Sequence, residues 1–138
     1  MPQRDHDDRR VIEEFRARGG VVGGSLAGTP LLLLTVTGAQ TSRPRTVPVA
    51  YLDEGGRLLM AAANGGAAKH PDWYYSVLAH PDVSVEVGDQ TFGATAVALR
   101  GDERELAFAR YVERFPALHD HQQRTDREIP IVALVRQT

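Results

Sequence analysis

The sequence predicts a mainly β protein of the α+β class, a small antiparallel β-barrel of about six strands flanked by three helices. Six short segments have the apolar or alternating composition of strands. Turn residues such as "DEGG" (53–56) and "GD" (88–89) join neighbouring strand segments closely enough for hairpins. Because so little helix lies between the strands, a small closed barrel is favoured over a doubly wound parallel sheet.

The expected strands follow the apolar pattern along the chain. They cover residues 31–38, 45–52, 57–63, 83–87, 90–99 and 129–135. The first begins with four leucines and is expected to be buried, whereas "VSVEV" in the fourth alternates as a half-buried strand does. Pro48 cannot donate a hydrogen bond to a neighbouring strand, so the second strand is expected at an edge or with a bulge.

Three helices are expected from apolar periodicity and from boundary residues. They cover residues 7–18, 71–79 and 102–115. In the first, Val11, Ile12 and Phe15 share one face. Pro71 suits the first turn of the second helix. Asp102 is expected to be the N-cap of the third, with Pro116 just beyond its end.

The overall composition indicates one globular domain of 138 residues. The formal net charge of -2 does not favour nucleic-acid binding. The chain has no cysteine, its first residues are too polar for a signal peptide, and no apolar run approaches the ~20 residues of a membrane-spanning helix. We therefore expect a cytoplasmic protein with an N-terminal helix and flexible glycine-rich connector (1–30) before a barrel domain (31–138).

The loop "TGAQTSRPRTVP" (37–48) has the composition of an anion-binding loop. Backbone N–H groups, the hydroxyls of Thr41 and Ser42, and the guanidinium groups of Arg43 and Arg45 all suit phosphate. The alternative is a solvated hairpin loop that happens to carry two arginines. Taken alone, the loop favours the solvated hairpin.

A second candidate segment, "NGGAAKHPDWYY" (64–75), contains the only lysine of the chain. Two glycines allow close approach of a ligand to the backbone, and Lys69 precedes a helix start, where the helix dipole also favours anions. Trp73 could cover a planar ring. Alternatively, Trp73 belongs to the core and Lys69 is a surface charge. The preceding small residues of "MAAA" (60–63) leave room for a flat ligand against the sheet.

Other kinds of chemistry find little support in the sequence. His119 and His121 are expected in a loop, and no histidine spacing indicates a metal site. There is no GxGxxG, Walker or GxSxG motif, and no serine has a neighbouring base. The segment after residue 115 is either a lid over a pocket or, more commonly, a simple connector.

Three stretches together resemble the deazaflavin-dependent nitroreductase family. They are "LLLLTVTGAQTSRPRTVPVAYL" (31–52), "MAAANGGAAKHPDWYYSVLAHPDVSVEV" (60–87) and "RTDREIPIV" (124–132). The resemblance implies a split β-barrel oxidoreductase that uses reduced coenzyme F420, with FMN a less suitable cofactor. The coenzyme would carry the hydride, so no residue is expected to act as a covalent catalyst.

The resemblance and the two loops together give a set of candidate residues. For the cofactor these are Gln40, Thr41, Ser42, Arg43, Arg45, Val47, Pro48, Val49, Ala62, Ala63, Asn64, Lys69 and Trp73. For the hydride acceptor they are Ala50, Phe115, Leu118 and His121.

The chain departs from the family at several basic positions. Ala39 and Gln40 stand where the family often has arginine and lysine, and Asn64 stands where it often has lysine. Arg45 and Lys69 are therefore expected to carry more of the anion binding. The resemblance thus predicts hydride transfer to a small conjugated acceptor, namely a quinone, an enone or a nitroaromatic.

Three points remain open from the sequence. Because basic residues are missing, a non-catalytic carrier of F420, a flavin or an apolar ligand is the alternative to an enzyme. A purely structural interaction module is a weaker third reading. Split barrels of this kind often pair, so a homodimer is possible.

Overall fold

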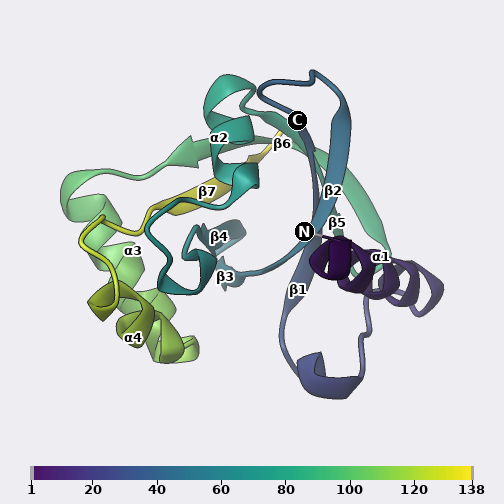
Figure 1. Cartoon of the computed structure of the whole chain (residues 1–138), viewed down its shortest axis with the longest axis horizontal. Helices are drawn as coiled ribbons and strands as arrows, with labels where there is room; N and C mark the ends of the chain where they lie inside the picture. Colours follow the sequence, from purple (N-terminus) through teal and green to yellow (C-terminus); the bar gives the residue numbers. More distant parts are fainter. Residues whose placement is uncertain (1, 138) are drawn as a thin grey trace.

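The computed structural model describes residues 2–137, with the side chains of residues 8–24 and 26–137. Seven strands form one antiparallel sheet in the order β2-β1-β5-β6-β7-β4-β3. Their bounds are β1 Leu31–Thr37, β2 Pro44–Ala50, β3 Leu52–Glu54, β4 Arg57–Ala61, β5 Asp82–Val87, β6 Gln90–Ala98 and β7 Ile131–Arg136. The sheet curls into a partial barrel (Figure 1), so the mainly β, split-barrel prediction is confirmed. The barrel is not closed as the strand pattern predicted, because the edge strands β2 and β3 do not pair with each other.

The helices lie around the ends and outer side of this barrel. They are α1 Pro2–Ala17, α2 Asp72–Ala79, α3 Gly101–Arg114 and α4 Ala117–Gln123, with short 3-10 turns η1 Gly24–Leu26 and η2 Asn64–Gly66. In Figure 1, α1 lies beside β1 and β2, whereas α3 and α4 lie at the opposite side of the molecule.

One predicted strand, residues 45–52, is in fact two strands at opposite edges of the sheet. β2 pairs with β1, whereas β3 pairs with β4. Tyr51 links them, and its N–H donates to the Pro30 carbonyl at 3.2 Å. The chain therefore crosses the opening of the barrel at this residue. The edge position of β2 also satisfies Pro48, as the sequence predicted.

Two predictions about helices were wrong. Residues 117–123, taken as a connector containing His119 and His121, form α4. Its Leu118 is 3% exposed, so burial of this side chain holds the short helix against the core. Asp102 is not the N-cap of α3, because that position belongs to Arg100. Asp102 lies instead in the first turn, where a carboxylate still complements the helix dipole.

The core consists of two clusters. The first lies inside the barrel and includes Leu32, Leu34 and Val85, all fully buried. The second lies under α3 and α4 and includes Leu59 and Ile129. The barrel interior and the α3–α4 layer are thus separately packed, and the segment of residues 62–76 runs along both.

α1 is fastened to the barrel near its C-terminal end. Phe15 is 1% exposed, and Arg16 forms a bidentate pair with Glu86 of β5 at 2.8 and 3.0 Å. Just beyond the helix, a Cβ on Gly20 would lie 2.6 Å from the Gly88 Cα, so the chain passes the turn between β5 and β6 very closely. This brings Asp8 of α1 to the mouth of the cavity described below. The predicted division of the chain at residue 30 stays a prediction.

Candidate functional site

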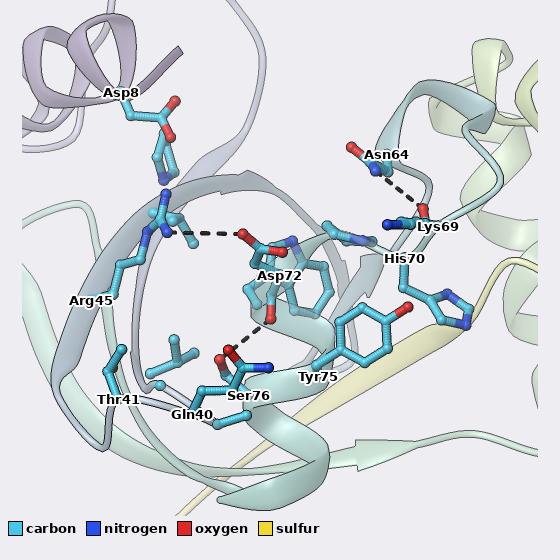
Figure 2. A pocket seen from close by; sticks show the side chains of 17 residues that line it. Asp8, Gln40, Thr41, Arg45, Asn64, Lys69, His70, Asp72, Tyr75 and Ser76 are labelled. Carbon is cyan, nitrogen blue, oxygen red and sulfur yellow. Dashed lines mark hydrogen bonds and ion pairs between the residues drawn. The ribbon is translucent and has the colours of Figure 1, made fainter. Parts of the chain in front are cut away.

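A cavity of about 510 Å³ opens between β2 and the N-terminal part of α2 (Figure 2). Its volume lies within the ~300–1,000 Å³ typical of small-molecule sites. One wall comes from the loop after β1 and from β2, and the other comes from η2, the following loop and α2. The two segments that the sequence indicated as anion-binding loops therefore face one cavity.

The first wall is a tight turn whose backbone is held by its own groups. Gly38 N–H donates to the Arg43 carbonyl at 2.8 Å, and Arg43 N–H donates to the Thr41 hydroxyl at 3.2 Å. A side chain on Gly38 would collide with that hydroxyl. Among the described residues, the N–H groups of Ala39 and Gln40 have no hydrogen-bond acceptor. They can therefore donate to an anionic ligand.

The second wall is a loop closed by Asn64. Its side-chain amide donates to the Lys69 carbonyl at 3.1 Å. Asn64 has a φ of 48°, a left-handed conformation that asparagine tolerates better than most residues. Gly66, with a φ of 84°, lies against α4, because a Cβ there would be 2.8 Å from the His121 carbonyl oxygen. Asparagine at position 64 thus shapes this loop where the family often has a cation.

Ser42 and Asn64 share an unusual backbone state. With φ values of 59° and 48°, they are the non-glycine residues with positive φ in the described part of the chain. One lies in each loop beside the cavity. Such backbone conformations persist only where the surrounding structure enforces them, and they are common at ligand sites.

Two cationic side chains lie on opposite sides of the cavity (Figure 2). The Arg45 guanidinium is 4.0 Å from the Asp72 carboxylate, and these side chains are 52% and 88% exposed. Lys69 is exposed and has no ion pair within residues 8–137. Because both cations remain accessible, they can bind an anionic group that enters between them.

The floor between the cations is apolar. Val36, Val47, Pro48 and Trp73 line it. Trp73 is partly buried against the first core cluster and meets the Tyr74 ring edge-on, with centroids 6.3 Å apart. Trp73 therefore packs against the core, and its role in covering a planar ring stays a prediction. An apolar lining combined with accessible cations and N–H groups fits a planar ligand that has an anionic tail.

Comparison with known proteins agrees with this geometry. The family model for F420H(2)-dependent quinone reductases matches residues 7–136. The chain belongs to the F420H(2)-dependent quinone reductase family. Membership confirms the predicted oxidoreductase class and coenzyme F420, and among the predicted acceptors it singles out the quinone.

Relatives of this family match most of the chain. The F420H(2)-dependent quinone reductase Rv1261c of Mycobacterium tuberculosis H37Rv is 36% identical over 126 residues, which is 88% of this chain and 85% of the relative. A solved F420-H2-dependent reductase, FDR-A, is 42% identical, with a TM-score of 0.70, over 76% of this chain and 93% of its own. Another structure, described as a domain-swapped dimer, is 38% identical, with a TM-score of 0.73, over 91% and 95%.

Eight of the residues predicted to bind the cofactor line the cavity. They are Gln40, Thr41, Arg45, Val47, Pro48, Asn64, Lys69 and Trp73. Ser42 and Arg43 lie in the same loop but beyond the lining. Val49 and Ala62 are buried in the barrel wall, and the Ala63 carbonyl accepts a hydrogen bond from Arg127. The assignment of all these residues to coenzyme F420 stays a prediction.

The four residues predicted to bind the acceptor do not line this cavity. Leu118 and Phe115 pack in or against the second core cluster, and His121 touches η2 through its backbone. The Ala50 carbonyl accepts a hydrogen bond from the Tyr111 hydroxyl at 3.4 Å. Burial raises the pKa of Tyr111 to about 12, so this phenol stays neutral. The structure therefore places Phe115, Leu118 and His121 behind the second wall, toward α3 and α4. Ala50 lies at the end of β2, where its carbonyl meets α3.

Among the residues in or beside the cavity that sequence reasoning missed, His70 and Arg127 are the two whose contacts bear on its shape. His70 was not among the predicted site residues, yet it lines the cavity and lies 4.7 Å from the Tyr74 ring, centroid to centroid. Arg127 lay inside the quoted stretch "RTDREIPIV" but received no role. The four hydrogen bonds of its guanidinium all go to residues 62–70. These contacts span about 57–65 positions in sequence, so no local pattern could reveal them.

Proposed function

We propose that this chain transfers a hydride from reduced coenzyme F420, bound in the cavity between β2 and α2, to a quinone. The observation that carries the proposal is the pair of accessible cations, Arg45 and Lys69, on either side of an apolar floor. Family membership supplies the reaction class, and the cavity supplies a place with matching chemistry.

The protein's part in this reaction is binding and orientation. Arg45, Lys69 and the N–H groups of Ala39 and Gln40 hold the anionic tail through charge-assisted hydrogen bonds. Val47, Pro48 and Trp73 provide the surface against which a planar ring lies. Reduced coenzyme F420, when bound, supplies the hydride. The enzyme then has to align an acceptor and keep it there.

The acceptor class follows from the family and from the chemistry of the product. A quinone that gains one hydride and one proton becomes a hydroquinone. Water reaches the cavity, whose rim residues Arg45 and Asp72 are well exposed, so protons are available from solvent. We therefore assign no proton donor among the side chains.

The proposal is tested by anaerobic turnover with reduced coenzyme F420 and a panel of benzoquinones, naphthoquinones and nitroaromatics. We expect quinone-dependent oxidation of the coenzyme, with quinones faster than nitroaromatics. Tight binding of the coenzyme without turnover of any acceptor would contradict the enzyme and favour the carrier. Absence of binding at tens of micromolar coenzyme would contradict both.

We also propose that the chain can form a homodimer. The support is the 38% identical structure described as a domain-swapped dimer. Light scattering coupled to size-exclusion chromatography tests it, and a monomer at all concentrations would contradict it.

The structure adds one observation on cellular location. None of its described helices is long and apolar enough to cross a membrane. The predicted cytoplasmic location stays a prediction.

A further inference from the structure

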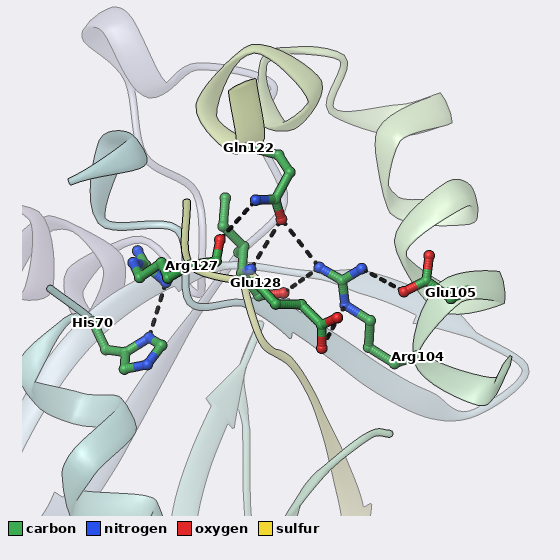
Figure 3. Close-up of polar contacts among 7 residues, drawn as sticks. His70, Arg104, Glu105, Gln122, Arg127 and Glu128 are labelled. Atoms are coloured by element: carbon green, nitrogen blue, oxygen red, sulfur yellow. Dashed lines mark hydrogen bonds and ion pairs between the residues drawn. The ribbon is translucent and has the colours of Figure 1, made fainter. Parts of the chain in front are cut away.

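Arg127 is bound to the cavity-forming segment 62–70 at four points (Figure 3 shows the one to His70). Its guanidinium donates to the carbonyls of Ala62 at 3.2 Å, Ala63 at 2.6 Å and Ala67 at 2.9 Å. It also lies 2.9 Å from Nδ1 of His70. All these acceptors belong to the loop that carries Asn64 and Lys69 to the cavity.

The contacts of Arg127 bracket Lys69. Ala67 precedes it by two residues and His70 follows it directly. Within residues 62–70, the Asn64 side chain donates to the Lys69 carbonyl. The N–H groups of Gly66 and Ala67 donate to the Ala63 and Asn64 carbonyls at 2.9 and 3.1 Å. The backbone on both sides of the lysine is thus fixed, and so is the point from which its side chain extends.

The contact with His70 also fixes a protonation state. A guanidinium can only donate, so Nδ1 of His70 must accept and the ring proton must lie on Nε2. Burial, together with the positive charge of Arg127, lowers the pKa of His70. Arg127 is the charged group that acts on the pKa of His70, and the rings of Tyr74 and Tyr75 pack against the imidazole.

Arg127 is in turn held by α3 and α4 (Figure 3). The Gln122 amide donates to the Arg127 carbonyl at 2.8 Å and accepts from the Ile129 N–H at 2.9 Å. Arg104, 5% exposed, donates to the Ile129 carbonyl at 2.6 Å and to Gln122 at 3.2 Å. A continuous set of hydrogen bonds therefore joins α3 to the cavity wall.

We propose that Arg127 is a positioning residue for the coenzyme site: it sets the conformation of residues 62–70, and with it the place of Lys69 and the tautomer of His70. The inference rests on the proposed function for its relevance to catalysis. Arg127 does not line the cavity, so it acts through the loop and not as a cation on the ligand.

The test compares Arg127→Lys and Arg127→Gln with matched changes at Arg124. Lysine keeps the charge, but its ammonium group lacks the planar set of five N–H donors with which a guanidinium reaches four acceptors. Arg124 is exposed and lies three residues away, and its side chain makes no hydrogen bond or ion pair within residues 8–137. Arg124→Lys and Arg124→Gln therefore control for charge and for the side-chain change.

Two readouts need no coenzyme. We expect the Gly66 and Ala67 amides to exchange at least tenfold faster in both Arg127 variants, beyond any change in global stability. Nitrogen shifts of His70 should show the Nε2–H tautomer in the wild type and a mixture in Arg127→Gln. Unchanged exchange and an unchanged tautomer would overturn the positioning role, even if the wild type failed to bind coenzyme F420.

A third readout separates geometry from charge. We expect the Kd and KM for coenzyme F420 to rise about tenfold in both Arg127 variants, with kcat within twofold and the Arg124 variants unchanged. If Arg127→Lys bound as the wild type does while Arg127→Gln bound weakly, Arg127 would be a simple cation and the proposal would fail. Failure of the wild type to bind would instead count against the proposed function.

Discussion

Two regions of the molecule use cationic side chains in opposite ways. Behind the second wall, Arg104 and Arg127 direct most of their N–H groups to protein acceptors at 2.6–3.2 Å. At the cavity rim, the Arg45 guanidinium lies 4.0 Å from the Asp72 carboxylate and is about half exposed, and Lys69 is exposed. Cationic side chains behind the wall hold the protein conformation through hydrogen bonds, whereas those at the cavity rim remain accessible to solvent.

This difference teaches which cations a ligand can use. A guanidinium with several short bonds to carbonyls would leave those carbonyls without a donor if it turned to a ligand, which costs ~1–3 kcal/mol for each buried group. An exposed cation with a long, solvated contact loses little by exchanging its partner. We therefore expect substitutions behind the wall to change stability and substitutions at the rim to change binding.

The largest effect on stability is expected for Arg104→Ala. The change leaves the buried Ile129 carbonyl without its 2.6 Å donor and removes the contact with Gln122, so we expect the free energy of unfolding to fall by about 2–3 kcal/mol. Chemical denaturation measures it. Arg110→Ala is the control, because Arg110 pairs with Glu54 while half exposed and should cost under ~1 kcal/mol. Equal losses would erase the contrast between buried and exposed arginines.

At the rim, Lys69→Ala and Arg45→Ala should weaken coenzyme binding by about 1–3 kcal/mol each, or roughly 5- to 150-fold in Kd. Stability should change by less than ~0.5 kcal/mol, since both side chains are exposed. Fluorescence titration with oxidised coenzyme F420 checks the affinity. The loss in Arg45→Ala should be larger at low salt, because screening is weaker there. Unchanged affinity in Lys69→Ala would show that the lysine faces solvent only.

A smaller effect is expected from the titration of His70, which should make the free energy of unfolding depend on pH. Because the pKa of His70 is lowered in the folded protein, the unfolded chain binds more protons as pH falls below ~6.5, and stability is lost in that direction. In His70→Asn, the amide oxygen can still accept from Arg127 but does not titrate. The free energy of unfolding, measured with urea at several pH values, should therefore fall less steeply with decreasing pH in this variant. If the free energy of unfolding changed equally with pH in both proteins, His70 would make no contribution to the pH dependence of stability.

The smallest effect is expected from Asp72→Asn. Its carboxylate lies 4.0 Å from Arg45 and is 88% exposed, so it competes only weakly with an anionic ligand. Removing the charge should tighten coenzyme binding about two- to threefold, less than ~1 kcal/mol. Asp102→Asn changes a first-turn aspartate of α3 and should leave the affinity unchanged. Weaker binding in Asp72→Asn would mean that the carboxylate itself contacts the ligand.

Local patterns in the sequence were enough for most of the fold. Alternation in "VSVEV" and the leucine run predicted β5 and β1, and Pro71 marked the start of α2. The break at Tyr51 escaped prediction, because β2 and β3 read as one apolar run and part only to reach opposite edges of the sheet. α4 escaped because it has just seven residues and depends on the burial of Leu118.

The candidate site was predictable where the sequence contains a rare residue and hidden where the site depends on distant contacts. The single lysine and the two glycines before it stand out in the sequence, and they lead to the second wall of the cavity. Arg127 and Gln122 look like ordinary polar residues. Their roles come from partners brought together by the docking of α4 and the segment before β7.

The most direct measurement is a crystal structure with oxidised coenzyme F420. The account predicts the coenzyme in the cavity between β2 and α2, with its anionic tail beside Arg45 and Lys69 and its ring against Val47, Pro48 and Trp73. A coenzyme bound on another face, or a complex in which both cations point away from it, would contradict the account.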